Sequence, residues 1–292
     1  MRDIAVISFA QTPARRRVPE LNEVEMLMPA VGQALSQVDM TIDDIGFTCS
    51  GSTDYLAGVG FSFVSTLDGV VAISSVPESN KIIAAGSEAD RFLMGLLRAF
   101  ADVIVVGSGT LHGSPKGLWA PDGPYPATAD ALAVLRRRLE LPPVPEVAIL
   151  TRSGSVDVDH PVFERGALVL TTRWGKAVLG ARLPAASTVV ALGEELDPRD
   201  AVAWLRERGH SLVLTEGGPT VFGSLVAAGL VDELFLTVSP LLAGRGDPDD
   251  RLQLIEDAPL LPEARVGGQL LSARAHGSHL FLRYELARQT QS

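Results

Sequence analysis

The stretch that decides the fold is Leu212-Val213-Leu214-Thr215-Glu216-Gly217-Gly218-Pro219-Thr220, followed by the apolar segment Val221–Ala228. This pattern predicts a buried strand that runs directly into a helix, with the proline at the first helical position. Glycines allow close backbone approach, and the free amides at the positive end of a helix can hold a pyrophosphate. An ordinary strand-to-helix turn explains the same residues. The motif is neither the Gly-x-Gly-x-x-Gly fingerprint nor a P-loop with its lysine.

Strands and helices alternate on both sides of this stretch. Ser87 and Asp90 form a capping-box-like start for an apolar helical stripe that ends at Phe100. A β-branched run then enters the glycine loop at 107–110, and a loop rich in proline and glycine continues through Pro126. Strands are expected at 61–65, 70–73, 103–106, 147–150, 167–171, 188–191 and 212–214, and helices at 92–100, 128–139 and 198–208, the last with Asp197 as N-cap.

The fold class that follows is α/β, with a mostly parallel sheet covered by helices on both faces. Three segments near the C-terminus, 233–238, 269–274 and 279–285, have strand character without helices between them. They predict an antiparallel edge.

Composition excludes several classes of protein. The chain has 292 residues, 46% of them apolar, and a net charge of −10, so a packed core is expected and nucleic acid is not an expected partner. The cluster Arg136–Arg138 is expected on a solvated helix face. Cys49 is the only cysteine, which excludes an intramolecular disulfide and a Cys-rich zinc site and fits a cytoplasmic location. No run approaches the roughly 18 apolar residues of a membrane span.

The first 58 residues are expected to form a separate unit. Segments 4–9, 21–38 and 45–49 predict a small βαβ-like appendage. Such a segment is too small to bury a core alone, so it must pack on something else or stay mobile. The predicted domains are therefore 1–58 and 59–288.

Four motifs in the larger domain resemble the riboflavin-biosynthesis pyrimidine reductases, the C-terminal domain of the bifunctional deaminase-reductase family. The motifs are Glu216-Gly217-Gly218-Pro219-Thr220 with Leu230-Val231-Asp232-Glu233-Leu234 and Ser239-Pro240, Ser65-Thr66-Leu67-Asp68-Gly69, Leu96-Leu97-Arg98-Ala99 with Asp102, and Val106-Gly107-Ser108-Gly109-Thr110. The resemblance implies a dihydrofolate-reductase-like mixed sheet, a cytoplasmic homodimer, and NADPH as cofactor. It also implies hydride reduction of a phosphorylated pyrimidine such as 5-amino-6-(5-phosphoribosylamino)uracil, in which a ribosyl group becomes a ribityl chain.

The resemblance assigns roles to individual residues, and each has a simpler alternative. Arg98 would bind substrate, although a helix-surface ion pair explains it equally well, and Glu216 would face substrate or relay a proton, unless it only caps a helix. Asp68 is a catalytic candidate that is more often a turn-former in Asp-Gly. Thr172, with Arg173, could hold a 2′-phosphate or belong to a solvated loop. The remaining cofactor candidates are Ser65, Thr110, Gly217, Gly218, Pro219 and Thr220.

No metal site is expected, because the three-residue spacing of His276 and His279 in extended structure puts them on opposite faces. His112 follows the Thr110 loop and is more simply an exposed residue.

Departures from the family pattern leave a second hypothesis open. Bifunctional members carry an acidic residue and an arginine in the loop after the threonine, where this chain has His112-Gly113-Ser114-Pro115-Lys116-Gly117-Leu118-Trp119. A non-catalytic nucleotide-binding or assembly module is therefore the alternative to the reductase. Residues 1–58 resemble the start of a thiolase of the sterol-carrier type, without its later catalytic regions, and in the alternative they would dock a partner.

Overall fold

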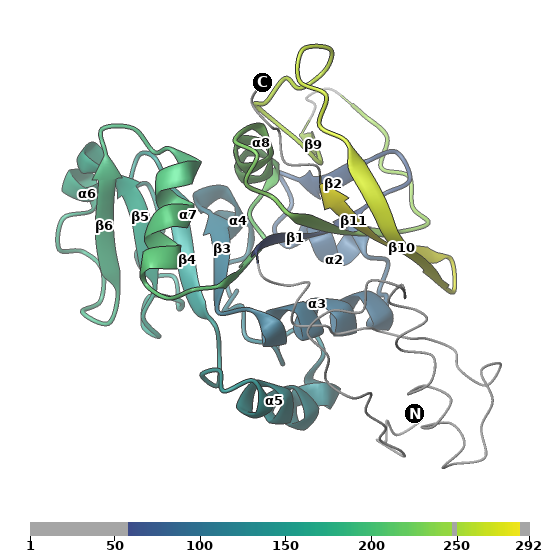
Figure 1. The fold of residues 1–292 in the computed structure, drawn as a ribbon, viewed down its shortest axis with the longest axis horizontal. Helices are drawn as coiled ribbons and strands as arrows, with labels where there is room; N and C mark the ends of the chain where they lie inside the picture. The colour runs from purple at the N-terminus through teal and green to yellow at the C-terminus, as the bar shows by residue number, and fades with distance from the viewer. Residues whose placement is uncertain (1–57, 247–249, 287–292) are drawn as a thin grey trace, which may run out of the picture. The chain divides into compact units, whose positions relative to one another are not determined.

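The computed structural model describes residues 58–246 and 250–286 (Figure 1). The chain divides into the units Met1–Gly51 and Ser52–Ser292, and every described residue belongs to the second. The strands and helix expected before residue 58, Cys49 and the thiolase-like segment lie outside the described residues. The proposed domain boundary at 58/59 therefore stays a prediction.

A nine-stranded sheet forms the centre of the fold, in the order β10-β11-β8-β1-β7-β3-β4-β5-β6. Neighbouring strands from β8 to β6 are parallel, whereas β11 pairs antiparallel with both β8 and β10. The expected mixed, mostly parallel sheet with an antiparallel C-terminal edge is confirmed. The strands are β1 Gly58–Ser65, β3 Val103–Gly107, β4 Glu146–Thr151, β5 Leu168–Thr172, β6 Thr188–Gly193, β7 Leu212–Thr215, β8 Glu233–Val238, β10 Gly268–His276 and β11 His279–Leu286; β2 Val70–Ile73 and β9 Arg251–Gln253 form a separate small sheet.

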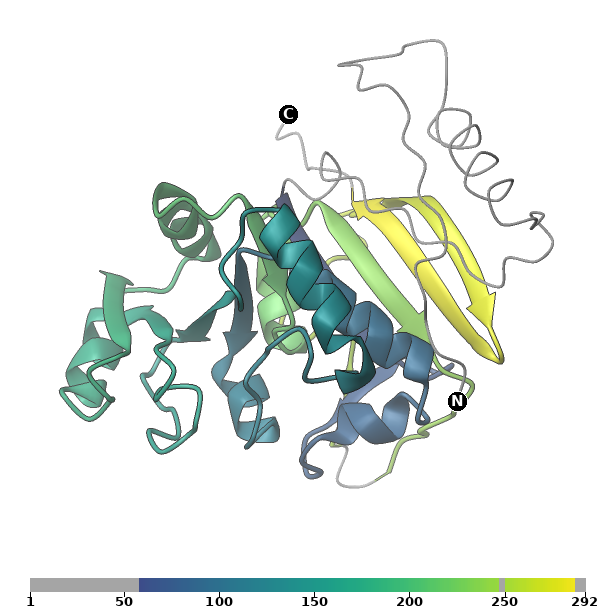
Figure 2. The same ribbon diagram turned by 90° about the horizontal axis from the view of Figure 1, so that it is seen from below.

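Helices cover both faces of the sheet, as expected (Figures 1 and 2). Alternate residues of β3 show the two faces: Val103 and Val105 pack with α7 and α8, whereas Ile104 and Val106 pack with α3, α4 and α6. Helix α5 lies against the outer side of α3 (Figure 2). The helices are α2 Ser79–Ile83, α3 Glu88–Phe100, α4 Ser108–Gly113, α5 Ala129–Arg138 after the 3₁₀ turn Pro126–Thr128, α6 Arg173–Leu179, α7 Pro198–Glu207 and α8 Pro219–Ala227.

The helix starts follow the side chains that the sequence offers. Asp197 accepts from the Arg199 amide and Ser87 accepts from the Asp90 amide, as expected of N-caps. Helix α8 differs, because Gly218 stands at its N-cap, Pro219 follows, and no side chain caps it. Its first-turn amides therefore lack the side-chain acceptor that the other two helices have.

Two expectations about surface chemistry were wrong. Arg136 is only 1% exposed, because its side chain turns under the end of α3, while Arg137 and Arg138 are exposed. His276 and His279 pair directly across the β10–β11 hairpin, so they share a face. The single-strand argument failed because a turn separates them. Within the described ranges, no three His, Cys, Asp or Glu side chains gather in a way that could hold a metal ion.

None of the helices in the described ranges has the length and apolar character needed to cross a bilayer.

Candidate functional site

The two glycine loops lie side by side at the carboxyl edge of the sheet. Strands β3 and β7 are parallel neighbours, and they lead into α4 and α8. The side chain of Val221 packs between the loops: an added Cβ would lie 2.8 Å from Val221 Cγ2 at Gly107 and 2.7 Å from Val221 Cγ1 at Gly217. Both positions therefore need glycine. Sequence reasoning missed Val221, which looks like any apolar helix residue.

Gly218 has a different environment, because only one atom lies close to the position that a Cβ would take. An added Cβ would meet only Thr110 Oγ1, at 3.3 Å, and the backbone is extended (φ −65°, ψ 175°), so no strain requires glycine. Thr110 is half-buried beside it. The result is a helix start without a side-chain cap, next to a threonine hydroxyl, which is the kind of site that binds a phosphate or pyrophosphate.

Pro219 and Thr220 are anchored to the segment around residue 256. The Pro219 carbonyl accepts from the Glu256 amide at 3.3 Å, and the exposed Thr220 hydroxyl donates to Asp257 Oδ2 at 3.1 Å. The Asp257 carboxylate therefore orients the Thr220 hydroxyl, whose oxygen can still accept a hydrogen bond. The hydroxyl can also rotate toward a ligand.

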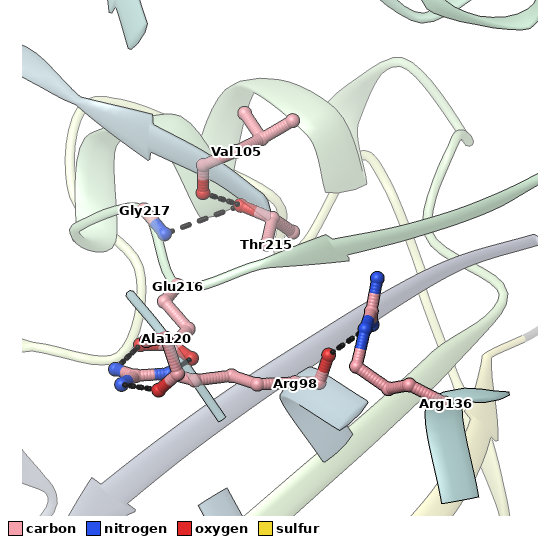
Figure 3. A network of polar contacts seen from close by, with 7 residues as sticks. All are labelled: Arg98, Val105, Ala120, Arg136, Thr215, Glu216 and Gly217. Carbon is pink, nitrogen blue, oxygen red and sulfur yellow. Dashed lines mark hydrogen bonds and ion pairs between the residues drawn. The ribbon is translucent and has the colours of Figure 1, made fainter. Parts of the chain in front are cut away.

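Arg98 and Glu216 form a bidentate ion pair beside this surface (Figure 3). Nε and Nη2 of the guanidinium donate to the two carboxylate oxygens, both at 2.6 Å, and each side chain is 11% exposed. Nη1 also donates to the Ala120 carbonyl at 3.3 Å. While it holds Glu216 and the Ala120 carbonyl, Arg98 keeps one unused N–H group on Nη1 and one on Nη2.

The backbone of β3 and β7 fixes the position of Glu216. Its amide donates to the Val105 carbonyl at 3.0 Å, and the Thr215 hydroxyl donates to the same carbonyl at 3.1 Å (Figure 3). Thr215 Oγ1 in turn accepts from the Gly217 amide at 3.2 Å. The acidic residue and the first glycine are thus locked to the neighbouring strand, so Glu216 acts neither as a helix cap nor as a free carboxylate here.

Ser65 and Asp68 lie at the same edge, in a second pair of joined loops. Phe61 of β1 pairs with Thr215, the last residue of β7, and β1 continues to Ser65, so Ser65 lies beyond the end of β7. Ser65 is buried, and its carbonyl accepts a hydrogen bond from the Ser239 amide at 2.8 Å. Asp68 accepts from the Thr66 hydroxyl at 2.5 Å and from the amides of residues 243 and 244 at 3.0 and 2.8 Å. These bonds lower the pKa of Asp68 to about 2, which favours the turn-forming role over proton donation.

Asp90 is a titratable residue that the sequence presented only as part of a cap. Its amide completes the Ser87 cap, but its carboxylate is 5% exposed and points inward near Thr237 and His279, and Oδ2 has no partner among the described residues. Burial raises its pKa, opposed by a hydrogen bond from Thr237.

Thr172 is used locally. Its hydroxyl is buried, accepts from the Gly175 amide at 2.9 Å as N-cap of α6, and donates to the Arg152 carbonyl at 2.9 Å. Arg173 forms an exposed ion pair with Glu194 at 2.8 Å. The hydroxyl has no free donor for a 2′-phosphate in this arrangement.

His160, a residue that sequence reasoning did not select, supports the loop after Thr110 through a hydrogen bond to the main chain. His160 is 2% exposed, contacts the Ser114 carbonyl through Nε2 at 2.9 Å and accepts from the Val162 amide at Nδ1. Trp119, 4% exposed, lies against its ring. His112, in the last turn of α4, and Lys116, on the loop that follows, are both exposed.

The family comparison and one curated relative agree with each other. The family model described as RibD C-terminal domain matches residues 58–256. The 2,5-diamino-6-ribosylamino-4(3H)-pyrimidinone 5′-phosphate reductase of Archaeoglobus fulgidus is 26% identical over 186 residues, which cover 63% of this chain and 80% of that protein.

Two solved structures share the fold. A pyrimidine reductase-like protein from Corynebacterium diphtheriae superposes with a TM-score of 0.67 at 21% identity, covering 83% of this chain and 96% of that one. The riboflavin biosynthesis reductase of Saccharomyces cerevisiae has a TM-score of 0.55 at 16% identity, covering 88% and 99%. The thiolase resemblance of residues 1–58 gains no support from these relatives and stays a prediction.

Proposed function

The chain belongs to the RibD C-terminal domain family, and from this premise we propose that it is an NADPH-dependent reductase of riboflavin biosynthesis. It converts the ribosyl group of a phosphoribosylamino-pyrimidine into a ribityl chain. The observation that carries the proposal is the juxtaposition of the uncapped α8 start and Thr110 with the mostly buried Arg98–Glu216 pair.

The cofactor's pyrophosphate would lie on the backbone at Gly217, Gly218 and Thr220. The fit is good because Gly218 leaves space that a Cβ would fill, and because the first-turn amides and helix dipole favour negative charge there. Thr110, against Gly218, would line the same surface, and Ser65 would line it from β1. When bound, NADPH supplies the hydride that reduces the ribosyl carbon.

Substrate would contact the outer side of the Arg98–Glu216 pair. The two hydrogen bonds from Arg98 leave other lone pairs of the Glu216 carboxylate unused, and these can accept hydrogen bonds from ribose hydroxyls. Arg98 retains two unused N–H groups for a substrate oxygen. Pairing each charge with the other keeps both side chains in one orientation, which serves hydride transfer because that reaction depends on positioning.

A homodimer is part of the proposal. Strand β10 forms one edge of the large sheet and is exposed along most of its length. Leu270, Leu271 and Leu280 are 49%, 37% and 45% exposed on this hairpin. An exposed apolar edge is normally covered, and a second copy of the chain would do so.

A cytoplasmic location fits the same proposal, since a chain with one cysteine needs no oxidising compartment.

The test is turnover of the phosphoribosylamino-pyrimidine by the purified protein, measured as loss of NADPH absorbance and formation of the ribityl product. Activity that disappears in Glu216→Gln, with NADPH binding retained, would support the proposal. Saturable NADPH binding with no turnover of any pyrimidine would instead favour the non-catalytic module.

A further inference from the structure

Arg136, on α5, is the most deeply buried cation in the described part of the chain. It is 1% exposed, and its hydrogen bonds go to main-chain carbonyls. Nη1 donates to the carbonyls of Arg98, Ala99 and Ala101, at 3.1, 3.1 and 2.9 Å, and Nε donates to that of Pro142 at 2.6 Å.

Three of these carbonyls belong to the last turn of α3 and its C-cap. The last carbonyls of a helix lack intrahelical partners and carry its negative dipole end, so a buried cation there satisfies both needs. Helix α3 ends at Phe100, only two residues after Arg98. The residue whose guanidinium pairs with Glu216 thus has its own carbonyl held by Arg136 (Figure 3).

We propose that Arg136 is a positioning residue: it clamps the C-terminal turn of α3 so that the Arg98 guanidinium stays aligned with Glu216, and it thereby sets the affinity for the pyrimidine substrate. The part concerning substrate rests on the proposed function. The part concerning alignment does not, since it is a property of the protein alone.

The charges around Arg136 support this role. Desolvation lowers its pKa to about 10, opposed by the nearby carboxylate of Asp102, so the side chain is cationic at neutral pH. One oxygen of the Asp102 carboxylate, Oδ2, accepts from the amides of residues 211 and 212 and from the Ser211 hydroxyl, at 2.8, 2.7 and 2.9 Å. The direct hydrogen-bond partners of the cation are therefore main-chain carbonyls, three of them at the end of α3 and its C-cap and one at Pro142.

The first experiment measures coupling by thermal unfolding of four proteins: wild type, Arg136→Lys, Glu216→Gln and the double variant. Lysine keeps the charge but cannot reach the same set of carbonyls. If Arg136 aligns the pair, the fall in Tm caused by Glu216→Gln in the Arg136→Lys protein will be at most about half of the fall that it causes in wild type. Additive losses would overturn the inference, because a merely structural role predicts independence of two side chains that bind different groups.

The second experiment measures the substrate part on the active protein. Arg136→Lys and Arg136→Gln are expected to raise KM for the pyrimidine roughly 10- to 100-fold while KM for NADPH stays within about twofold. Arg137→Gln, an exposed neighbour on the same helix, is the matched control and should change neither constant. Equal effects of the Arg136 variants on both KM values would overturn this part. Absence of turnover in wild type would count against the proposed function, while the unfolding experiment would still decide the alignment.

Discussion

Breaking the Arg98–Glu216 pair by Glu216→Gln should cost stability as well as activity. Glutamine keeps the volume and one acceptor oxygen, but it removes the charge that faces the guanidinium. Arg98 would then be a nearly buried cation whose remaining partners are one amide oxygen and the Ala120 carbonyl.

The expected loss follows from the burial and geometry of the pair. Removing one partner of a buried ion pair typically costs about 3–5 kcal/mol. Both side chains are 11% exposed and glutamine retains one hydrogen bond, so we expect the lower end of this range, about 3 kcal/mol. For a domain of this size, that loss corresponds to a fall in Tm of roughly 6–12 °C.

The assay is thermal unfolding of Glu216→Gln, Arg98→Met, the double variant, and Glu194→Gln as control. The control breaks the Arg173–Glu194 pair, whose side chains are 72% and 73% exposed, so Tm should change little. The double variant removes the uncompensated charge and should recover part of the loss, without recovering turnover. A Glu216→Gln protein that melts within about 1 °C of wild type would refute the reasoning, because the pair would then contribute nothing.

Three further variants test individual residues. The pKa of Asp68 is lowered from 3.8 to about 2, so its carboxylate contributes to stability above pH 3.8, and this contribution is lost as the pH falls toward 2. Asp68→Asn should therefore flatten the dependence of Tm on pH between 3.8 and about 2. An unchanged dependence would contradict the turn-forming role of the carboxylate. Burial raises the pKa of Asp90, so ionisation of its carboxyl group destabilises the folded state as the pH rises. Asp90→Asn should therefore raise Tm relative to wild type at neutral pH, and the gain should shrink in acid. A lower Tm of Asp90→Asn at neutral pH would contradict this effect of burial. Thr172→Ala should cost about 1 kcal/mol through the lost cap of α6, seen as a lower Tm, while a loss of NADPH affinity would restore the 2′-phosphate role.

The strands of the large sheet could be predicted because apolar, β-branched runs such as 103–106 are buried on both faces and carry a strong signal. The short helices could not. Helix α4 has six residues and α6 has seven, and both are too short to display an apolar stripe. The sequence therefore predicts a glycine loop in place of α4 and gives no helix signal for α6.

The site was predictable where it depends on local sequence and hidden where it depends on long-range contacts. The strand–glycine–proline–helix pattern predicted the start of α8, and the family resemblance brought Thr110 and Glu216 into one site. Nothing local shows that Glu216 would bind Arg98, 118 residues away, or that Arg136 would reach the end of α3. A charge cluster in a sequence normally marks a solvated face, and the packing of α5 on α3 overrides that rule for one arginine of three.

The central claim is that the start of α8 holds the cofactor, and an NADPH fluorescence titration of wild type and Gly218→Asp tests it most directly. The backbone angles at Gly218 suit any residue, and a Cβ there meets only Thr110 Oγ1 at 3.3 Å, so the fold should tolerate the change once the Thr110 side chain shifts slightly. The added carboxylate would stand where the pyrophosphate is expected. Saturable binding in wild type that is lost in a Gly218→Asp protein of nearly unchanged Tm is the predicted result. Equal NADPH affinity in the two proteins would contradict the claim.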